Sequence, residues 1–319
     1  MHDRRNRLSR CRPIRFGGIV ALVVVLAGLV ASTAVATPPG RDGLIAYVSH
    51  DPWFSGDHGI VTVRPDGRNL HIVTRDFRDE SPSWSPDGLS LVFVRAGRLY
   101  VIRLDGTGLK LITPRRLKGI RQPAWSPGGH AIAFVRRSSL YVMPASGGVT
   151  RRIFQSGDSI PDHPAWSPDG QWITFGLVKW GGNDSMLSHG SIVVMRSTGS
   201  DLRYVTTAGT SDYPAQPDFV ADDYEPDWSP DGTRIIFVRT VWLCGSCDQD
   251  EVFSVGAEGG DTQWVTTDTG FEANRSVWSP SGTRIASETS RGLAVLTAAG
   301  TLVRVLDPGG TEPAWQSLR

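Results

Sequence analysis

The chain has 319 residues, of which 39% are hydrophobic and 20% are charged, and it contains 36 glycines and 21 prolines. This composition is typical of a globular protein rich in turns, and it excludes a disordered or fibrous chain. The 33 lysines and arginines nearly balance the 32 aspartates and glutamates. Because nucleic-acid binding needs a concentrated basic surface, we expect no nucleic-acid partner.

Residues 1–36 have the pattern of an export signal. Six arginines precede an uncharged apolar run over residues 16–30, and Ala34-Val35-Ala36 matches the small-x-small site of a signal peptidase. We therefore expect residues 37–319 in the periplasm, outside the cell or associated with the cell envelope. An uncleaved anchor is the alternative, because residues 17–36 are about long enough to span a bilayer. Only in that case do we expect contact with a membrane.

Cleavage would change the charge of the protein. Removing residues 1–36 takes away six arginines and one aspartate, so the formal balance changes from 33 against 32 to 27 against 31, a net charge of −4. It also removes Cys11 and leaves Cys244 and Cys247.

Short strands separated by turns follow the signal. We predict strands over residues 44–49, 60–64 and 70–74, with the turn Pro65-Asp66-Gly67 between the last two. Helical periodicity does not occur anywhere in residues 37–319.

A five-residue phrase, Trp-Ser-Pro-Asp-Gly, then defines a repeated unit. It begins at Trp84, Trp166 and Trp228; looser copies begin at Trp125 and Trp278, and a Pro-Ala-Trp ends at Trp315. In the first unit we predict strands over residues 82–84, 90–95, 99–104 and 110–113, and the same order repeats in residues 124–150, 165–206, 227–266 and 277–305. Four antiparallel strands per repeat make one blade of a β-propeller.

The phrase itself is explained by turn chemistry. Pro86 fixes φ at the first corner, Asp87 can accept hydrogen bonds from the turn backbone, and Gly88 tolerates a positive φ. The second strand of the unit, residues 90–95, is apolar on successive residues, so both of its faces must be covered, as happens when blades stack on one another.

The repeats predict an all-β, six-bladed propeller over residues 37–319. Five units are complete, and the orphan strand at residues 312–315 supplies the one strand that residues 44–74 lack. We expect this C-terminal strand to pair with the N-terminal strands and close the ring, which removes exposed edges.

Over residues 43–315 the chain resembles the TolB-type, WD-repeat-like propellers and the propeller domains of prolyl oligopeptidases. The resemblance to TolB implies interaction with cell-envelope proteins, although TolB carries an additional N-terminal domain for which this sequence has no room. The resemblance to the oligopeptidases does not extend to their hydrolase half, because the sequence has no Gly-x-Ser-x-Gly motif and no α/β segment after Trp315.

All of the predicted long loops fall on one face of the ring. They cover residues 50–59, 179–190, 208–224 and 240–250, opposite the Ser-Pro-Asp-Gly turns. Long loops confined to one face of a repeat scaffold are typical of a binding face. Aromatic residues in them are candidate contacts for a protein or peptide partner, or alternatively pack over their own loops: Trp53, Trp180, Tyr213 and Trp242.

The channel offers a second group of candidates. The residues three positions before each repeat tryptophan are Ser81, Gln122, His163, Glu225, Arg275 and Glu312. Of these, His163, Glu225, Arg275 and Glu312 are candidate ligand-binding residues, or alternatively members of a mutually satisfied polar ring. Some sugar-acid lyases with similar propellers hold a metal on several channel histidines, whereas His163 is the single histidine among these six channel positions. We therefore expect no metal or other cofactor in the channel.

Two further motifs lie in the long loops. Asp218, Asp222 and Asp223 form an acidic cluster, either a calcium site or a solvated loop. Cys244 and Cys247 are expected to form a local disulfide in an oxidising compartment, with redox chemistry as the alternative.

These features predict a monomeric, non-catalytic, exported propeller that acts as a protein- or peptide-binding scaffold in the cell envelope. The alternative is an enzyme, a lyase or hydrolase, that acts on a carbohydrate or lactone at the channel mouth.

Overall fold

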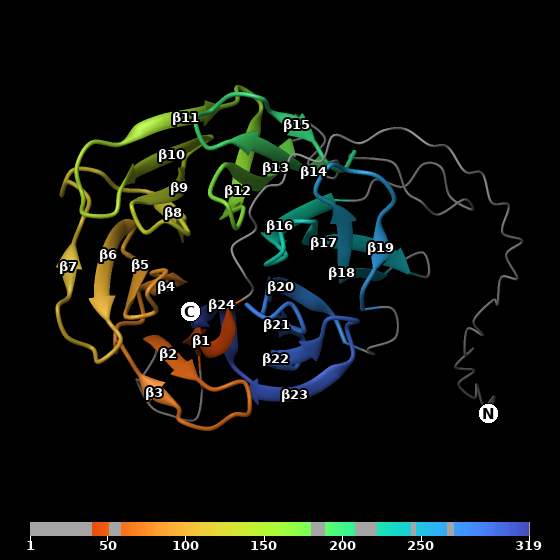
Figure 1. Ribbon diagram of the computed structural model, residues 1–319, viewed down its shortest axis with the longest axis horizontal. Helices are drawn as coiled ribbons and strands as arrows, with labels where there is room; N and C mark the ends of the chain where they lie inside the picture. The colour runs from red at the N-terminus through yellow and green to blue at the C-terminus, as the bar shows by residue number, and fades with distance from the viewer. Residues whose placement is uncertain are drawn as a thin grey trace, which may run out of the picture. The chain divides into compact units, whose positions relative to one another are not determined.

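A computed structural model describes residues 40–50, 59–179, 189–207, 222–243, 247–266 and 271–318. Over these residues the chain forms six four-stranded antiparallel sheets arranged around a centre (Figure 1). The sheets are the blades of a propeller, which confirms the predicted fold class. The signal or anchor predicted in residues 1–36 lies outside the described residues. Among the described residues, no helix is long and apolar enough to cross a membrane.

The strands of each blade follow one another from the channel outward. Blade one contains β24 (Gly310–Leu318), β1 (Arg41–Ser49), β2 (Gly59–Val63) and β3 (His71–Ile72). Blade two contains β4 (Asp79–Trp84), β5 (Ser90–Arg95), β6 (Arg98–Arg103) and β7 (Lys110–Leu111). Blade three contains β8 (Ile120–Trp125), β9 (Ala131–Arg136), β10 (Ser139–Pro144) and β11 (Arg151–Gln155).

The other three blades keep the same order. Blade four contains β12 (Ser159–Trp166), β13 (Trp172–Lys179), β14 (His189–Arg196) and β15 (Arg203–Tyr204). Blade five contains β16 (Asp222–Trp228), β17 (Arg234–Leu243), β18 (Cys247–Gly256) and β19 (Gln263–Trp264). Blade six contains β20 (Ala273–Trp278), β21 (Arg284–Thr289), β22 (Gly292–Thr297) and β23 (Leu302–Asp307).

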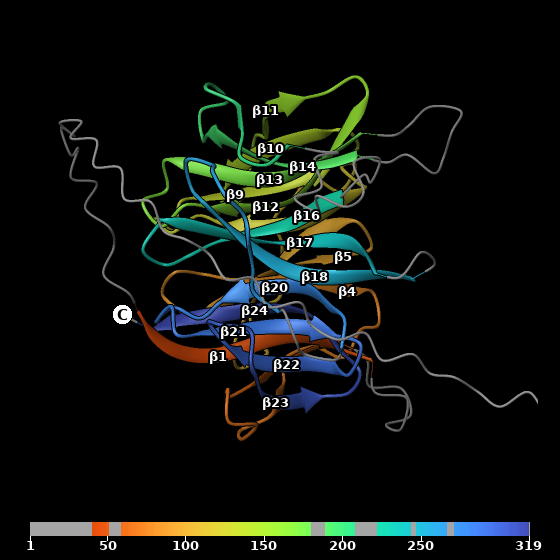
Figure 2. The ribbon, with the colours of Figure 1, turned by 90° about the vertical axis from the view of Figure 1, so that its right-hand side faces the viewer.

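The turn after each repeat tryptophan is built as its sequence predicts. In blade two the Ser85 hydroxyl donates to Asp87 Oδ1 at 2.5 Å, and the backbone N–H of Leu89 donates to the same oxygen at 3.0 Å. Gly88 has a φ of 70°, a conformation that costs glycine little. We call the face of the ring with these turns the turn face, and the opposite face the loop face; Figure 2 shows the ring edge-on.

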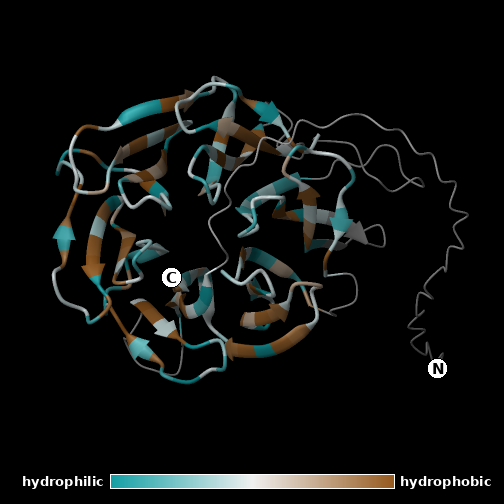
Figure 3. Ribbon diagram, in the orientation of Figure 1, coloured by the Kyte–Doolittle hydropathy of each residue, from teal (hydrophilic) through white to brown (hydrophobic). Residues whose placement is uncertain are grey.

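The core lies between neighbouring blades. One cluster joins Val92 and Leu99 of blade two to Ile132 and Phe134 of blade three. These side chains are completely buried, and Figure 3 shows the hydrophobic residues along the middle strands of the blades. This packing explains why the second strands are apolar on successive residues, because one side of each sheet meets the previous blade and the other meets the next.

The C-terminal strand closes the ring as predicted. Strand β24 pairs with β1 through Ile45 opposite Trp315 and Ala46 opposite Ala314. Both strands are longer than expected, because pairing continues to Arg41 opposite Leu318. The outermost strands β3 and β7 are only two residues long, shorter than predicted. Short outer strands leave few unpaired edge groups for another chain to pair with.

Candidate functional site

In each blade the pairing between the innermost strand and the next strand is interrupted by a register shift at the same place. In blade two the ladder pairs Glu80 with Val94 and then Ser83 with Val92, so that Ser81 and Pro82 remain unpaired. A proline cannot donate to a ladder and is tolerated at such a bulge. Five of the six blades have a proline in this position: Pro82, Pro123, Pro164, Pro226 and Pro313.

The bulge gives the residue before the proline an unusual backbone. Ser81, Gln122, His163, Glu225 and Glu312 all have φ values between 42° and 54°. Left-handed conformations of non-glycine residues often occur at functional sites. Blade six differs, because Ser276 replaces the proline and pairs with Ser287, so the unpaired residues there are Asn274 and Arg275. We call the six residues predicted from the tryptophan spacing, including Arg275, the channel ring.

The channel ring separates two cavities. A cavity of about 330 Å³ on the turn-face side is lined by prolines, alanines and tryptophans of all six innermost strands. A wider cavity of about 630 Å³ is lined by Phe77, Arg78 and Ala96 from turns and crossings of the loop face. Gln122, His163, Glu225 and Arg275 line both cavities. The ring therefore forms a polar constriction between an apolar half and a charged half of the channel.

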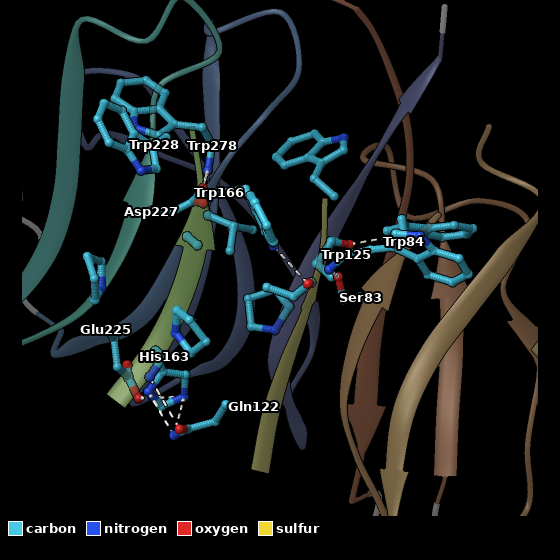
Figure 4. A pocket seen from close by; sticks show the side chains of 18 of the residues that line it. Ser83, Trp84, Gln122, Trp125, His163, Trp166, Glu225, Asp227, Trp228 and Trp278 are labelled. Atoms are coloured by element: carbon cyan, nitrogen blue, oxygen red, sulfur yellow. Dashed lines mark hydrogen bonds and ion pairs between the residues drawn. The ribbon is translucent and has the colours of Figure 1, made fainter. Parts of the chain in front are cut away.

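His163 is at the centre of a hydrogen-bonded group that spans three blades (Figure 4). Its Nδ1 lies 2.7 Å from Asp162 Oδ2, and its Nε2 lies 3.6 Å from Glu225 Oε1. The side-chain amide of Gln122 donates to Asp162 Oδ1 at 2.7 Å, and Gln122 Oε1 accepts the backbone N–H of His163 at 3.2 Å. These contacts hold the imidazole between two carboxylates.

The opposite side of the ring contains one arginine and several carboxylates. Arg275 Nη1 lies 3.6 Å from Glu312 Oε1. The Glu312 carboxylate accepts the backbone N–H of Ser81, and the backbone N–H of Glu312 donates to Glu288 Oε2 at 3.1 Å. Glu80 and Glu288 also line the wider cavity.

The surroundings shift the pKa values of these groups. Burial opposes the charged form of His163, but the Asp162 and Glu225 carboxylates outweigh it and raise its pKa. Burial raises the pKa of Glu225. The nearby His163 and Arg275 lower it, but they offset the effect of burial only in part. Reduced hydration and the charge of Glu312 raise the pKa of Glu80. Five carboxyl groups line the wider cavity with Arg78, Arg275 and His163: Asp79, Glu80, Glu225, Glu288 and Glu312.

Two buried polar atoms of the ring have no hydrogen-bond partner. They are Glu225 Oε2, an acceptor, and Arg275 Nη1, a donor whose nearest carboxylate oxygen is the 3.6 Å contact with Glu312. Leaving such atoms unpaired costs about 1–3 kcal/mol each. The ring predicted as a polar cluster therefore exists, but it does not satisfy all of its own members.

Several predicted site residues fall elsewhere. Trp53, Trp180, Tyr213, Asp218 and Cys244 lie outside the described residues. For Trp242 and Cys247 only the backbone is described: Trp242 lies in β17 opposite Asp248, and Cys247 is the first residue of β18, opposite Leu243. The disulfide and the loop contacts therefore remain predictions.

The acidic cluster is partly engaged in other contacts. Both carboxylate oxygens of Asp223 accept from Arg239, at 2.6 and 2.9 Å. Asp222 Oδ1 accepts the backbone N–H of Gly190 at 2.7 Å. Across the described part of the chain, no group of three or more His, Cys, Asp or Glu side chains is placed to hold a metal ion.

Four residues that the structure places at the site were not predicted from the sequence. Asp162, Glu80 and Glu288 add carboxylates to the channel ring or the wider cavity. Phe77 lies at the same opening with 77% of its surface exposed. Asp162 and Glu80 directly precede the ring residues His163 and Ser81, so their position next to the motif could have identified them. Glu288 and Phe77 are distant in sequence from the motif and had no comparable signal.

The fold and the site define a class, a six-bladed β-propeller with a polar constriction across its channel. No protein-family model matches the chain, and no curated protein matches it. Solved structures do match. A protein of Agrobacterium tumefaciens assigned as TolB is 20% identical with a TM-score of 0.61, over 86% of this chain and 91% of that one.

Two other solved structures share the fold. A chain of a nidogen–laminin complex is 9% identical with a TM-score of 0.64, over 86% of this chain and 98% of that one. An oligogalacturonate lyase in complex with manganese is 17% identical with a TM-score of 0.54, over 80% of this chain and 72% of that one. At these identities the similarity shows the fold, which serves both binding proteins and enzymes, and it confirms the expected TolB-like propeller.

Proposed function

We propose that this chain is an exported binding scaffold that holds a segment of a protein or peptide partner at the loop-face opening of its channel. The observation that carries the proposal is the surplus of carboxylates in that opening. Glu80, Glu225, Glu288 and Glu312 line or border the cavity, whereas Arg275 is the one ring arginine that faces them within the described residues. Two other charged groups that line the cavity are already paired, Asp79 with Arg95 at 2.5 Å and Arg78 with Asp76 at 2.7 Å.

A cationic group of the partner would complete this arrangement. Carboxylates whose pKa is raised by burial and by one another are stabilised when a positive charge approaches. A lysine, arginine or amino terminus would donate to Glu225 Oε2, and a peptide carbonyl would accept from Arg275 Nη1. Glu225 Oε2 and Arg275 Nη1 have no hydrogen-bond partner among the described residues. One peptide segment would supply a donor for the first atom and an acceptor for the second.

Phe77 adds an apolar contact beside this pocket. Its ring is 77% exposed, the largest exposed fraction among the described aromatic residues. The Arg78 guanidinium lies 5.8 Å from its ring centroid. Exposed aromatic residues next to charged groups are typical anchors of protein interfaces. We therefore expect the bound segment to combine a basic and an apolar side chain.

Export remains part of this proposal and rests on the pattern of residues 1–36. The nidogen–laminin structure supports the scaffold class only by analogy, because a propeller of this fold occurs there in a protein complex.

A second candidate function is favoured by the pair formed by His163 and Asp162. A carboxylate 2.7 Å from Nδ1 orients an imidazole as in general acid–base sites. Glu225, with its raised pKa, could carry a proton at the same place. These residues, with Arg275 and Glu312, would serve a lyase or hydrolase acting on a carbohydrate or lactone. The described contacts of His163 Nε2 are to Glu225 and Gln122, which favours a structural role over proton transfer.

The two candidates are separated by binding and turnover measurements on the same variants. For binding, the probes are short synthetic peptides of equal length that contain Lys-Phe, Glu-Phe or Ser-Ser pairs, titrated calorimetrically. We expect the Lys-Phe peptide to bind best and Glu225→Gln/Glu312→Gln to weaken it at least about tenfold, because charge-assisted hydrogen bonds contribute about 1.5–3 kcal/mol. The control Glu258→Gln/Asp261→Asn removes two carboxylates on the turn face.

Equal affinity for the three peptides, or equal loss in both double variants, would contradict the scaffold proposal. Turnover of a polysaccharide and lactone panel that disappears in His163→Ala would replace it with the enzyme.

A further inference from the structure

Blade three and its crossing from blade two have an unusual charge distribution. Between Asp105 and Asp158 the sequence contains nine lysines and arginines and no acidic residue. The chain as a whole has nearly equal numbers of each sign, so this stretch concentrates positive charge locally. Arg98 of the adjoining hairpin of blade two lies at the loop face together with six of the nine: Arg115, Arg116, Lys118, Arg121, Arg136 and Arg137. We call these seven residues the basic patch.

The centre of the patch is an ordered loop, residues 114–119. Leu117 packs against the core cluster shared by blades two and three, and its backbone N–H donates to Pro114 O at 2.8 Å. The loop ends at Ile120, whose N–H donates to Gly97 O at 3.1 Å. Three charged side chains project from this anchored backbone into solvent, those of Arg115, Arg116 and Lys118.

Two arginines of the flanking hairpins hold the loop from either side. Arg98 Nε donates to Arg115 O at 3.1 Å, and Arg136 Nε donates to Lys118 O at 2.9 Å. Blade two and blade three are therefore joined through the loop. Because each contact uses only Nε, these two guanidinium groups add their charges to the patch without being neutralised.

The charges of the patch are unmatched within the described part of the chain. The ion pairs found there involve other residues. Arg121 acts on Glu80 and Asp162 only through longer-range attraction. Bringing this many like charges together raises the energy of the folded chain unless an anion is bound. The arrangement is preorganised for a ligand with several negative charges.

We propose that the basic patch binds a linear acidic polysaccharide along the loop face of blades two and three. A polymer with one carboxylate on each sugar can contact several of the seven cations at once. Each arginine guanidinium can bind a carboxylate through two parallel hydrogen bonds. The proposal does not rest on the peptide pocket, because none of the seven patch residues lines that cavity.

Single-stranded nucleic acid, membranes and proteins fit the patch less well. Nucleic acid binding to single strands relies on aromatic stacking, and membrane binding relies on inserted apolar side chains. Protein interfaces rely on aromatic and aliphatic anchors. The large exposed hydrophobic residues of the described chain lie outside the patch: Leu70, Phe77, Leu89, Leu109, Val149, Leu202, Tyr204, Val303 and Leu318. A hydroxylated polyanion needs none of these anchors.

Alginate, a linear polyuronate, is the test probe, with neutral dextran, an oligo-dT strand and vesicles of anionic phospholipid alongside. We expect alginate to bind at low ionic strength and dextran not to bind. The variant Arg115→Gln/Arg116→Gln/Lys118→Gln should weaken alginate binding at least about tenfold, because it removes three of the seven cations of the patch. It should also make the affinity less dependent on salt. With a coefficient of about 0.7 per cation, as for single-stranded nucleic acid, removing three cations reduces the slope of log K against log salt concentration by about two.

The matched control is Arg68→Gln/Arg103→Gln/Lys110→Gln, which removes three exposed cations from the turn-face side of blades one and two. We expect its alginate affinity to stay within about twofold of the parent protein. The proposal fails if alginate does not bind, or if both triple variants lose the same affinity. Patch-dependent binding that is tighter to oligo-dT or to the vesicles than to alginate would also overturn it.

Discussion

Gln316 connects the two ends of the propeller, and replacing it tests how the ring is closed. Its Oε1 accepts the backbone N–H of Leu44 at 2.8 Å, and its Nε2 donates to Gly88 O at 2.8 Å. The side chain is 6% exposed. It occupies the place beside Gly88 that a turn proline fills in other blades, where Pro86 lies against Gly129.

The change Gln316→Ala leaves one donor and one acceptor of the backbone without partners. Each unpaired buried group costs about 1–3 kcal/mol. A cavity of about 720 Å³ borders Leu44 and Gln316, so water can reach part of the site and reduce this cost. Glutamine also loses about 1–2 kcal/mol of rotamer entropy when it is buried, whereas alanine loses none, and this difference offsets part of the cost. We expect a net loss of about 2–3 kcal/mol in the free energy of unfolding.

Denaturant unfolding followed by tryptophan fluorescence measures this loss as a lower midpoint with an unchanged slope. The control Gln155→Ala removes the same amide from an exposed position on β11 and should change the free energy by less than about 0.5 kcal/mol. If the two variants unfold at the same midpoint, Gln316 does not stabilise the closure, and the reasoning from its two hydrogen bonds is wrong.

Three further predictions follow from the described contacts. Burial raises the pKa of Asp227 to about 7 despite hydrogen bonds from the backbone of Trp278 and Trp228, whereas an unfolded aspartate titrates near about 3.9. Its proton is thus held more tightly in the folded chain, so stability should fall as pH rises from about 4 to 7, by at most about 4 kcal/mol; Asp227→Asn should flatten this part of a stability–pH curve, and an unchanged curve would contradict the assignment. Asp223→Asn should cost about 3–5 kcal/mol in chemical denaturation, because it removes the carboxylate charge from a buried pair in which Arg239 donates at 2.6 and 2.9 Å, while Asp158→Asn at the exposed Lys179 pair should cost under about 1 kcal/mol. Mass measurement after alkylation of the native exported protein should find no free thiol at Cys244 and Cys247, and two added labels would refute the predicted disulfide.

The blade count and the closure followed from spacing in the sequence. Turn chemistry fixes the Ser-Pro-Asp-Gly hairpins locally, since Ser85, Asp87 and Gly88 make their contacts within six residues of one another. The incomplete copy at Trp315 identified the strand missing from blade one. The boundaries of β3 and β24 were less accurate, because strand ends depend on how far a partner strand continues.

The channel ring was found for the same reason, because its members share one offset from the repeat tryptophan. This spacing could not show which other charged side chains surround the channel ring. Glu288 comes from a second strand and reaches the ring through the backbone of Glu312. Phe77 belongs to a crossing whose position depends on two blades. Neither residue is related to the motif by a fixed spacing.

By itself the sequence determined the repeat, the turns, the number of blades and the offset of the channel residues, because each of these is set by interactions over a few residues or by periodicity. The tertiary structure alone decided which charges meet. It placed Glu80, Glu225, Glu288 and Glu312 around one cavity, and it gathered the basic patch from two hairpins and a crossing. Electrostatic interaction depends on distance in space, and closing a ring brings together residues that no local rule relates.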